Sequence, residues 1–233
     1  MSIDNILSLT DLRFGYDPNQ VLIDIKHFQI QRGESVFLRG PSGSGKSTLL
    51  GLMGGVLSPQ SGTLSISGHD ITKISSAQKD KVRADHLGII FQQLNLLPYI
   101  DVIQNCILPC RFSKRRREQA IEASGSVTAA AEALIRGLGL TESELNRSVS
   151  DLSVGQQQRV AVARALIGGP DLIIADEPTS ALDHDNRDRF IDLLNQSREQ
   201  FGSALLFVSH DQSLAAHFDR SVSLSELNPA VLT

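Results

Sequence analysis

The chain has 233 residues, of which 41% are hydrophobic and 21% charged, a balance typical of one globular domain that buries a full core. Its formal net charge of −4 excludes a general electrostatic attraction to nucleic acid or anionic lipid. No apolar run approaches the roughly 18 residues that span a bilayer, and no basic stretch followed by an apolar one predicts a signal peptide.

Strand patterns dominate the N-terminal part of the chain. Residues 6–14 alternate apolar and polar side chains, and strand-like patterning continues around residues 28–30 and 36–38, as expected for half-buried strands. The last of these strands leads into a glycine-rich loop at residues 40–45, and a helix is expected to begin near Lys46. This order of strand, loop and helix is the one that a phosphate-binding loop requires.

The middle of the chain changes from strands to helices. Residues 62–67 and 87–91 are interpreted as further strands, separated by a polar helical stretch at about residues 76–85. Strand signals then disappear, and residues 127–138 carry Ala, Leu and Ile at helical spacing. We therefore expect a helical subdomain at about residues 94–152, inserted into an α/β domain.

Two features of this helical region concern thiols and charge. Cys106 and Cys110 are four residues apart, and no His or further Cys lies close in sequence. Two buried thiols in a reducing compartment are therefore favoured over a metal pair. The basic cluster at residues 114–117 is followed by Glu118. A solvated helix start is favoured over contact with lipid headgroups or with an acidic loop of a partner.

Strands and helices alternate again toward the C-terminus. Apolar patterning predicts a helix at about residues 154–167, a strand at 172–175, a helix at 183–200 and a strand at 204–209. A further helix is expected after His210. Because strands that alternate with helices form a mostly parallel sheet covered on both faces, the predicted fold class is α/β.

The glycine-rich loop fits the eight-position phosphate-loop pattern over residues 40–47. Glycines allow backbone N–H groups to converge on phosphate oxygens, and the helix start adds its positive dipole end. Lys46 is expected to reach the β- and γ-phosphates and the Ser47 hydroxyl to ligate Mg²⁺. The alternative is a Gly-Ser turn that matches by accident, and the flanking strand and helix argue against it. The residues predicted to hold the nucleotide here are Gly40, Pro41, Ser42, Gly43, Ser44, Gly45, Lys46, Ser47 and Thr48.

The apolar strand at residues 172–175 ends in two carboxylates, Asp176 and Glu177. Asp176 suits a role in Mg²⁺ binding together with Ser47. Glu177 is placed to activate the attacking water as general base. Taken alone, a buried strand that runs into an acidic turn is common, so this interpretation depends on the phosphate loop that precedes it.

The segment at residues 152–159 reads Leu-Ser-Val-Gly-Gln-Gln-Gln-Arg. Ser153 is a good N-cap residue, and apolar residues at helical spacing follow it. As a bare pattern this segment predicts a well-capped helix. It becomes specific only in sequence with the phosphate loop and the two carboxylates.

Taken in order, the phosphate loop, the Leu-Ser-Val-Gly-Gln segment, the Asp-Glu strand end and His210 resemble the nucleotide-binding subunits of ABC transporters. The resemblance covers about residues 7–224. It implies a single ABC ATPase domain, residues 1–233, of the P-loop NTPase fold. That domain has a mostly parallel core sheet, an N-terminal antiparallel β part and the helical insert.

The resemblance also implies roles for single residues. Ser153 and Gly155 would contact the γ-phosphate held by the opposite subunit, and Gln156 belongs to the same nucleotide-binding set. Gln92 resembles the loop glutamine that senses Mg²⁺ and the attacking water. His210 resembles the switch histidine that touches the γ-phosphate.

Three further positions are interpreted through the same resemblance. Tyr16 resembles the aromatic residue that stacks on adenine, a suitable role for a π-face, and residues 180–183 resemble the loop that crosses the dimer interface. Position 154 is Val where the family usually has Gly, a departure from which we infer no loss of activity. Without the family, Tyr16 is simply a surface aromatic, His210 a capping histidine and Gln92 a solvated polar residue.

Residues 91–98, Phe-Gln-Gln-Leu-Asn-Leu-Leu-Pro, are similar to the lipoprotein-release and macrolide-export branch of the family. The resemblance implies ATP and Mg²⁺ as ligands and a homodimer that sandwiches ATP. It implies a separate integral membrane permease, contacted near residues 92–99 and the helical insert. It places the chain on the cytoplasmic face of a bacterial inner membrane and implies no nucleic-acid partner.

Two alternatives to a transport motor stay open on the sequence. One is a regulatory ATP-dependent binding module of a membrane complex, as in the cell-division member of the family. The other is a soluble ABC ATPase that takes no part in transport. The cargo is not encoded in this chain, because specificity in such systems lies in the membrane partner.

Overall fold

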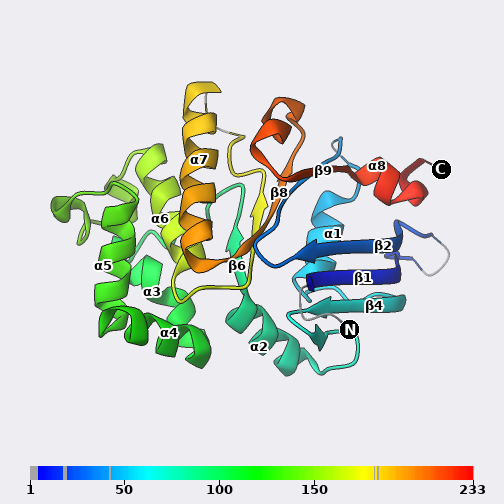
Figure 1. The fold of residues 1–233 in the computed structure, drawn as a ribbon, viewed down its shortest axis with the longest axis horizontal. Coiled ribbons are helices and arrows are strands. Elements are labelled where there is room, and N and C mark those ends of the chain that lie inside the picture. The colour runs from blue at the N-terminus through cyan, green and yellow to red at the C-terminus, as the bar shows by residue number, and fades with distance from the viewer. Residues whose placement is uncertain (1–4, 18–19, 42, 181, 183, 233) are drawn as a thin grey trace.

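Two β-sheets and a group of helices make up the molecule, as Figure 1 shows. The computed structural model describes residues 5–17, 20–41, 43–180, 182 and 184–232. Within these residues the strands form a four-stranded sheet in the order β2-β1-β4-β5 and a five-stranded sheet in the order β6-β7-β8-β3-β9. The five-stranded sheet lies between the four-stranded sheet and the helices α3 to α6.

The four-stranded sheet is antiparallel and is built from the N-terminal part of the chain. Strand β1 (Asn5–Phe14) pairs with β2 (Ile23–Gln31) on one side and with β4 (Ser61–Ile66) on the other, and β4 pairs with β5 (His69–Asp70). The alternating pattern of the sequence places the apolar side chains of β1 and β2 in the core. The expected antiparallel N-terminal part is therefore confirmed.

The five-stranded sheet is parallel in every strand pair. Its strands are β3 (Ser35–Arg39), β6 (Leu87–Ile90), β7 (Leu172–Asp176), β8 (Ala204–Ser209) and β9 (Arg220–Ser223). Because parallel strands share one carboxyl edge, β3, β7 and β8 end side by side. The chain segments that follow Arg39, Asp176 and Ser209 therefore meet at this edge.

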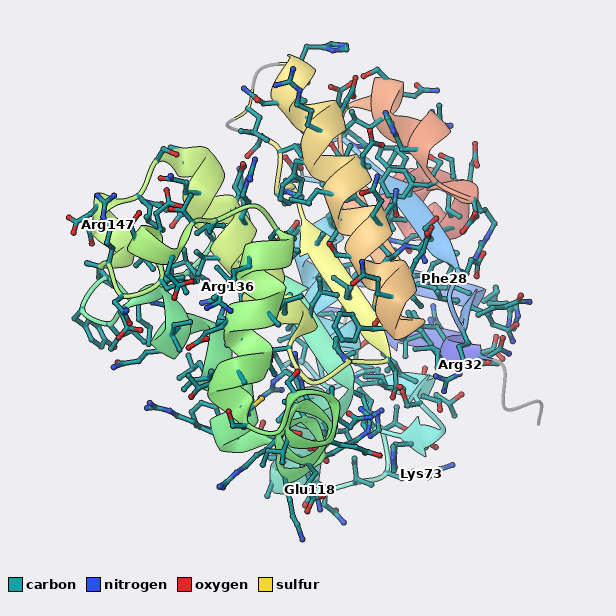
Figure 2. The ribbon with its side chains drawn as sticks, turned by 60° about the vertical axis from the view of Figure 1, so that its left-hand side comes forward. Phe28, Arg32, Lys73, Glu118, Arg136 and Arg147 are labelled. Atoms are coloured by element: carbon teal, nitrogen blue, oxygen red, sulfur yellow. The ribbon has the colours of Figure 1, made fainter. Side chains whose placement is uncertain are left out.

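The α-helices are α1 (Lys46–Met53), α2 (Ser76–His86), α3 (Val102–Phe112), α4 (Lys114–Ser124), α5 (Val127–Gly137), α6 (Val154–Leu166), α7 (His184–Phe201) and α8 (Leu224–Leu227). Short 3₁₀ helices occur at Glu142–Glu144, Val149–Asp151, Gln212–His217 and Pro229–Leu232. Helix α7 crosses the face of the parallel sheet, and α4 and α5, which carry Glu118 and Arg136, lie beside it (Figure 2). No helix of the described ranges combines the length and the apolar character that crossing a bilayer requires.

The region after His210 differs from the sequence-based expectation of a helix. It forms the 3₁₀ helix Gln212–His217 and then β9, which pairs with β3 at the edge of the parallel sheet. Strand β9 reads Arg-Ser-Val-Ser, and its first two residues are exposed. Because it carries no apolar run, its strand character comes from pairing with β3 rather than from its own pattern.

The two cysteines are buried thiols, as the sequence indicated. Cys106 and Cys110 lie on α3, within the core formed between the helices and the parallel sheet. Burial is the main cause that raises the pKa of both thiols. Both therefore remain protonated and unreactive in the folded protein.

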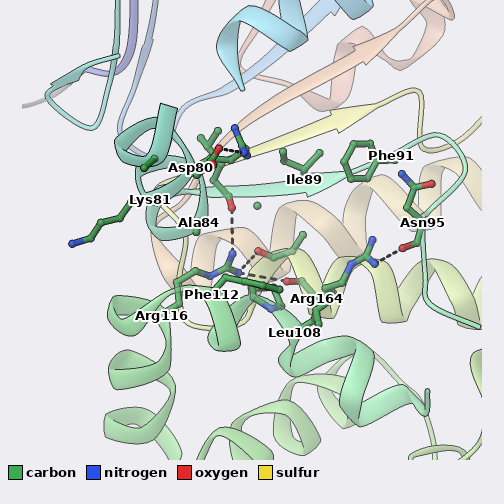
Figure 3. Close-up of a pocket in the computed structure, with 16 residues that line it drawn as sticks. Asp80, Lys81, Ala84, Ile89, Phe91, Asn95, Leu108, Phe112, Arg116 and Arg164 are labelled. Atoms are coloured by element: carbon green, nitrogen blue, oxygen red, sulfur yellow. Dashed lines mark hydrogen bonds and ion pairs between the residues drawn. The ribbon is translucent and has the colours of Figure 1, made fainter. Parts of the chain in front are cut away.

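The solvated helix start expected at residues 114–117 holds for Lys114 and Arg117, which are exposed, and is wrong for Arg116. Arg116 is only 2% exposed. Its guanidinium donates to the backbone oxygens of Ile167 (2.7 Å), Ala165 (2.7 Å) and Leu87 (3.2 Å), and Figure 3 shows it pointing toward α6. The last carbonyl groups of a helix have no partner within the helix, so the end of α6 attracts a buried cation that sequence periodicity cannot reveal.

Replacing Arg116 with Met is expected to lower the free energy of unfolding by about 3 kcal/mol, because buried carbonyl groups lose their donors. Chemical denaturation measures this change. Arg117→Met is the matched control, since Arg117 is the exposed neighbour on the same helix. Equal unfolding free energies for the two variants would contradict a structural role for Arg116.

Asp171, immediately before β7, joins three parts of the fold. Its carboxylate accepts hydrogen bonds from Ser67 after β4 (2.9 Å), from His86 at the end of α2 (2.5 Å) and from Arg115 on α4 (3.1 Å). Burial opposes the charged form, but the hydrogen bonds from His86 and Ser67 and the charge of Arg115 outweigh it and hold the pKa of Asp171 well below its ordinary value. One buried carboxylate thus links the antiparallel sheet to the helices.

Candidate functional site

The loop between β3 and α1 has the backbone geometry of an anion site. Gly43 and Gly45 have φ values of +79° and +89°, in the left-handed region that favours glycine. Gly45 is also the N-cap of α1, and no side chain caps this end of the helix. The first N–H groups of a helix have no acceptor within it, so they remain available to a phosphate at this end.

Lys46 begins α1 and is buried at the base of this loop. Its Nζ atom donates to the backbone oxygens of Gly40 (2.7 Å) and Pro41 (3.0 Å). The same Nζ lies 3.4 Å from Oε1 of Glu177. The ammonium group is therefore held between the loop and the end of β7, where it can meet both a phosphate and the acidic turn.

Ser47 and Thr48 follow on the first turn of α1. The side chain of Ser47 is exposed, and that of Thr48 is buried with its Oγ1 3.3 Å from the Tyr16 hydroxyl. Ser44 is buried, and its Oγ donates to the backbone oxygen of Pro41 at 2.8 Å, closing the loop from within. Ser42, also predicted to hold nucleotide, lies outside the described residues.

Asp176 and Glu177 stand at the end of β7, at the carboxyl edge of the parallel sheet. The N–H of Glu177 donates to the oxygen of Val208 on β8 at 2.9 Å, and Glu177 has a φ of +44°. A non-glycine residue in this region is strained, and such strain is often found at functional sites. Burial, with a smaller contribution from the adjacent Glu177, raises the pKa of Asp176 against the opposing charge of Lys46.

These neighbouring carboxylates form a donor set that fits a hard divalent cation. A cation of this kind would relieve both the burial of Asp176 and its repulsion with Glu177. Mg²⁺ prefers oxygen ligands and is usually bound through one or two protein groups together with phosphate oxygens. The hydroxyl of Ser47 and the carboxylate of Asp176 are oxygen donors of the required kind.

His210 completes a contact chain at the edge of the sheet. It follows β8, and its Nδ1 lies 3.0 Å from Oε2 of Glu177. The imidazole is largely exposed while the glutamate is mostly buried. The structure therefore brings Lys46, Glu177 and His210 together, although they are far apart in sequence.

Gln92 lies on a different segment, after β6. Its side chain is exposed, and in the described part of the chain no hydrogen bond joins it to Lys46, Glu177 or His210. The residues after it are unusual, since Leu94 and Asn95 both have positive φ values, of 56° and 48°. Arg164 of α6 donates to the backbone oxygens of both residues.

Ser153, Gly155 and Gln156 form the N-terminus of α6. The Ser153 hydroxyl accepts from the N–H of Gln156, while Oε1 of Gln156 accepts from the N–H of Ser153 at 2.8 Å, a capping box. The Gln156 amide also donates to Glu144. A side chain built on Gly155 would meet nothing within 4 Å, and Val154 beside it is 55% exposed. This helix end is open to the exterior.

Tyr16 lies next to the first turn of α1 and is 71% exposed. Its ring packs edge-on against Phe14, with 5.1 Å between ring centroids. Its position near Thr48 places an aromatic side chain beside the phosphate loop. In the predicted dimer-interface loop, Ala181 and Asp183 lie outside the described residues.

Sequence reasoning did not identify Arg164. A signal was available, because Arg164 falls on the same face of α6 as the apolar Val160 and Ile167 and is itself buried. A charged residue on an apolar helix face requires hydrogen-bond partners elsewhere in the fold. Its partners, the backbone oxygens near Gln92, are not encoded in any local pattern.

Comparison with known proteins gives consistent matches. The model of the ABC transporter family matches residues 23–180. The lipoprotein-releasing system ATP-binding protein LolD of Novosphingobium aromaticivorans is 39% identical over 228 residues, covering 96% of this chain and 97% of the relative. LolD of Shewanella denitrificans is 39% identical over 207 residues, covering 89% and 85%. The dimeric post-hydrolysis structure of the ATP-binding cassette MJ0796 with ADP and Pi is 31% identical with a TM-score of 0.75, covering 96% and 95%.

Proposed function

Because the chain belongs to the ABC transporter family of ATP-binding domains and is an ATPase, we propose that two copies close on two ATP molecules and drive a separate membrane protein. The family, the fold and ATP hydrolysis to ADP and phosphate, as inferred from the sequence, are confirmed by these matches. The dimer, the roles of single residues, Mg²⁺ and the membrane partner are proposals of our own.

The open N-terminus of α6 is the observation that carries the dimer proposal. Ser153 and Gly155 are exposed, and no neighbour covers Gly155. Figure 1 shows α6 on the side of the molecule away from α1, the helix that begins at the phosphate loop. A helix N-terminus attracts anions, and a second copy could bring its bound phosphate there. An isologous pair then completes two sites at once.

Within each site, the contacts support a division of roles for hydrolysis. Lys46 and the loop N–H groups bind the phosphates, and Glu177 accepts a proton from the attacking water. His210 holds Glu177 and can reach the γ-phosphate. Bound Mg²⁺, held by Ser47, Asp176 and Gln92, would neutralise developing charge on the phosphate oxygens.

Two other residues of the proposed nucleotide set act through packing. Tyr16 offers an exposed ring beside the loop, which suits stacking on adenine. Gln156 orients the N-terminus of α6 through its capping box with Ser153, so its contribution is to the shape of the site formed with the opposite copy.

The membrane partner is proposed to dock where α2, β6 and α3 meet. A cavity of about 590 Å³ lies there, and Phe91 and Phe112 on its lining are exposed. Clustered exposed aromatics are typical of protein contacts. Because the relatives are named as lipoprotein-releasing system proteins, we propose a permease of that kind, with this chain on the cytoplasmic face of a bacterial inner membrane.

Replacing Gly155 with Glu tests the composite site. We expect ATP-dependent dimerisation to be lost and turnover to fall by about 100-fold or more, because a carboxylate would repel the phosphate of the opposite copy. ATP binding by the single chain should remain. Light scattering with and without ATP, steady-state hydrolysis and ATP titration measure the three quantities.

Gly137→Glu provides the matched control. A side chain at Gly137 also meets nothing within 4 Å, and this residue lies at the end of α5 rather than of α6. The control should dimerise and hydrolyse ATP as the native chain does. Native turnover by Gly155→Glu would rule out the composite site.

A further inference from the structure

Arg164 connects α6 to the loop that carries Gln92. Its side chain is 8% exposed. Its two terminal nitrogens donate to successive carbonyl groups, one to the oxygen of Leu94 and the other to that of Asn95 at 2.6 Å. Figure 3 shows the side chain reaching from α6 to Asn95. Within the described ranges no carboxylate pairs with Arg164, and its guanidinium donates to the backbone oxygens of this loop instead.

The loop needs such support, because its backbone is strained. Leu94 and Asn95 are consecutive non-glycine residues with positive φ, a strained conformation that persists only where the surrounding structure holds it. Two short turn bonds, from the N–H of Leu94 to Phe91 (2.9 Å) and of Asn95 to Gln93 (2.6 Å), complete the fold of the loop. Gln92 lies inside the segment that these contacts shape.

The same arginine borders the cavity proposed to receive the membrane partner. Arg164, Asn95, Phe91 and Phe112 all line it, as Figure 3 shows. At the other end of α6 stand Ser153 and Gly155. The helix spans 13 residues, or about 20 Å at the helical rise per residue. One rigid helix therefore contacts the Gln92 loop near its C-terminus and carries, at its N-terminus, the open end proposed to meet the opposite copy.

We propose that Arg164 is a positioning residue, which holds the Gln92 loop against α6 in the conformation that lets Gln92 serve the ATP site. This inference rests on the proposed function, in which Gln92 serves hydrolysis. Loss of the two Arg164 hydrogen bonds would let the strained loop relax and would displace Gln92.

The test compares Arg164→Met with Arg159→Met. Arg159 lies on the same helix, and one of its nitrogens also donates to two successive backbone oxygens, those of Leu138 and Gly139. We expect Arg164→Met to lower kcat by about 10- to 100-fold, as displacement of a positioned group does. The KM for ATP should change by less than about threefold, because the phosphate loop is untouched. Arg159→Met should keep the native kcat.

Hydrogen exchange without nucleotide supplies a readout independent of activity. The amides of residues 91–97 should exchange faster in Arg164→Met than in the native chain. In Arg159→Met the same amides should exchange at the native rate. Replacing Asn95 with Gly in the Arg164→Met background should recover part of the lost kcat, because glycine accepts the positive φ without strain. Native exchange across residues 91–97 in Arg164→Met would overturn the proposal.

A double-mutant cycle with Gln92→Ala distinguishes failure of the Arg164 proposal from failure of the proposed role of Gln92 in hydrolysis. If Arg164 acts through Gln92, the double variant should be no slower than Gln92→Ala alone. Additive losses would show that Arg164 acts elsewhere and would overturn the inference. Native kcat in Gln92→Ala would instead remove the proposed role of Gln92, while the exchange experiment still decides whether Arg164 holds the loop.

Discussion

Glu177→Gln is expected to lower ATP turnover by about 1,000-fold, the scale of a positioned general base, while ATP binding persists. Glutamine keeps the size of the side chain but cannot take a proton from water. Bound ATP would then remain unhydrolysed, so the closed dimer should accumulate when ATP is present.

The structure explains why this residue carries so large an effect. Glu177 lies 3.4 Å from the Lys46 ammonium and 3.0 Å from the His210 imidazole, and its strained backbone is fixed by a bond to β8. Its carboxylate is thus aimed from the end of β7 toward the phosphate loop. No flexible element separates the base from the sheet edge.

Single-turnover hydrolysis and size-exclusion chromatography with ATP measure the two expected results. Glu118→Gln is the control, because Glu118 is an exposed residue on α4 that pairs only with Lys114 in the described structure. Turnover of Glu177→Gln at the rate of Glu118→Gln would remove Glu177 from the role of base.

Asp171→Asn is expected to lower the free energy of unfolding by about 3 kcal/mol at neutral pH, the scale for loss of one member of a buried charged cluster. Arg115 and His86 would lose the carboxylate to which they donate. Because Asp171 joins the antiparallel sheet, α2 and α4, the loss should weaken the whole domain rather than one loop.

The same residue makes stability depend on pH with a definite sign. The pKa of Asp171 is lower in the folded than in the unfolded state, so the unfolded chain binds more protons in acid. The contribution of Asp171 to the free energy of unfolding is complete above the unfolded-state pKa, near 4. This contribution is lost as the pH falls from there toward the folded-state pKa. Asp171→Asn should therefore lose less stability on acidification than the native chain.

Urea denaturation at pH 7 and at about pH 2.5, well below the unfolded-state pKa of an aspartate, measures both effects. Asp11→Asn serves as the control, since Asp11 is exposed and pairs with Lys26 at 3.5 Å on the surface. Unfolding curves of Asp171→Asn that coincide with those of the control would show that the buried cluster contributes nothing to stability.

The contiguous motifs were predictable because their chemistry is local. The phosphate loop, the carboxylates after β7 and the capped start of α6 each need particular residues at fixed spacing, and the parallel sheet brings strand ends together. Lys46, Glu177 and His210 meet for that reason. The contact of Gln92 with the ATP site stays a prediction, because it depends on how the loop is held.

The features that sequence reasoning did not reach depend on distant partners. Arg116 belongs to a run of charges that predicts solvent exposure, and only the free carbonyl groups at the end of α6 explain its burial. Strand β9 has no apolar pattern and exists because β3 leaves an edge to pair with. In both cases a tertiary partner overrides local propensity.

The burial of Cys106 and Cys110 also decides how motion in this protein can be observed. They are the chain's two cysteines, both covered by the core and both with raised pKa values, so thiol reagents react with them slowly while the fold is intact. A cysteine introduced at an exposed position such as Val154 or Phe112 would take up a spectroscopic label selectively. Distances between two copies could then be followed through the ATP cycle without removing the native thiols.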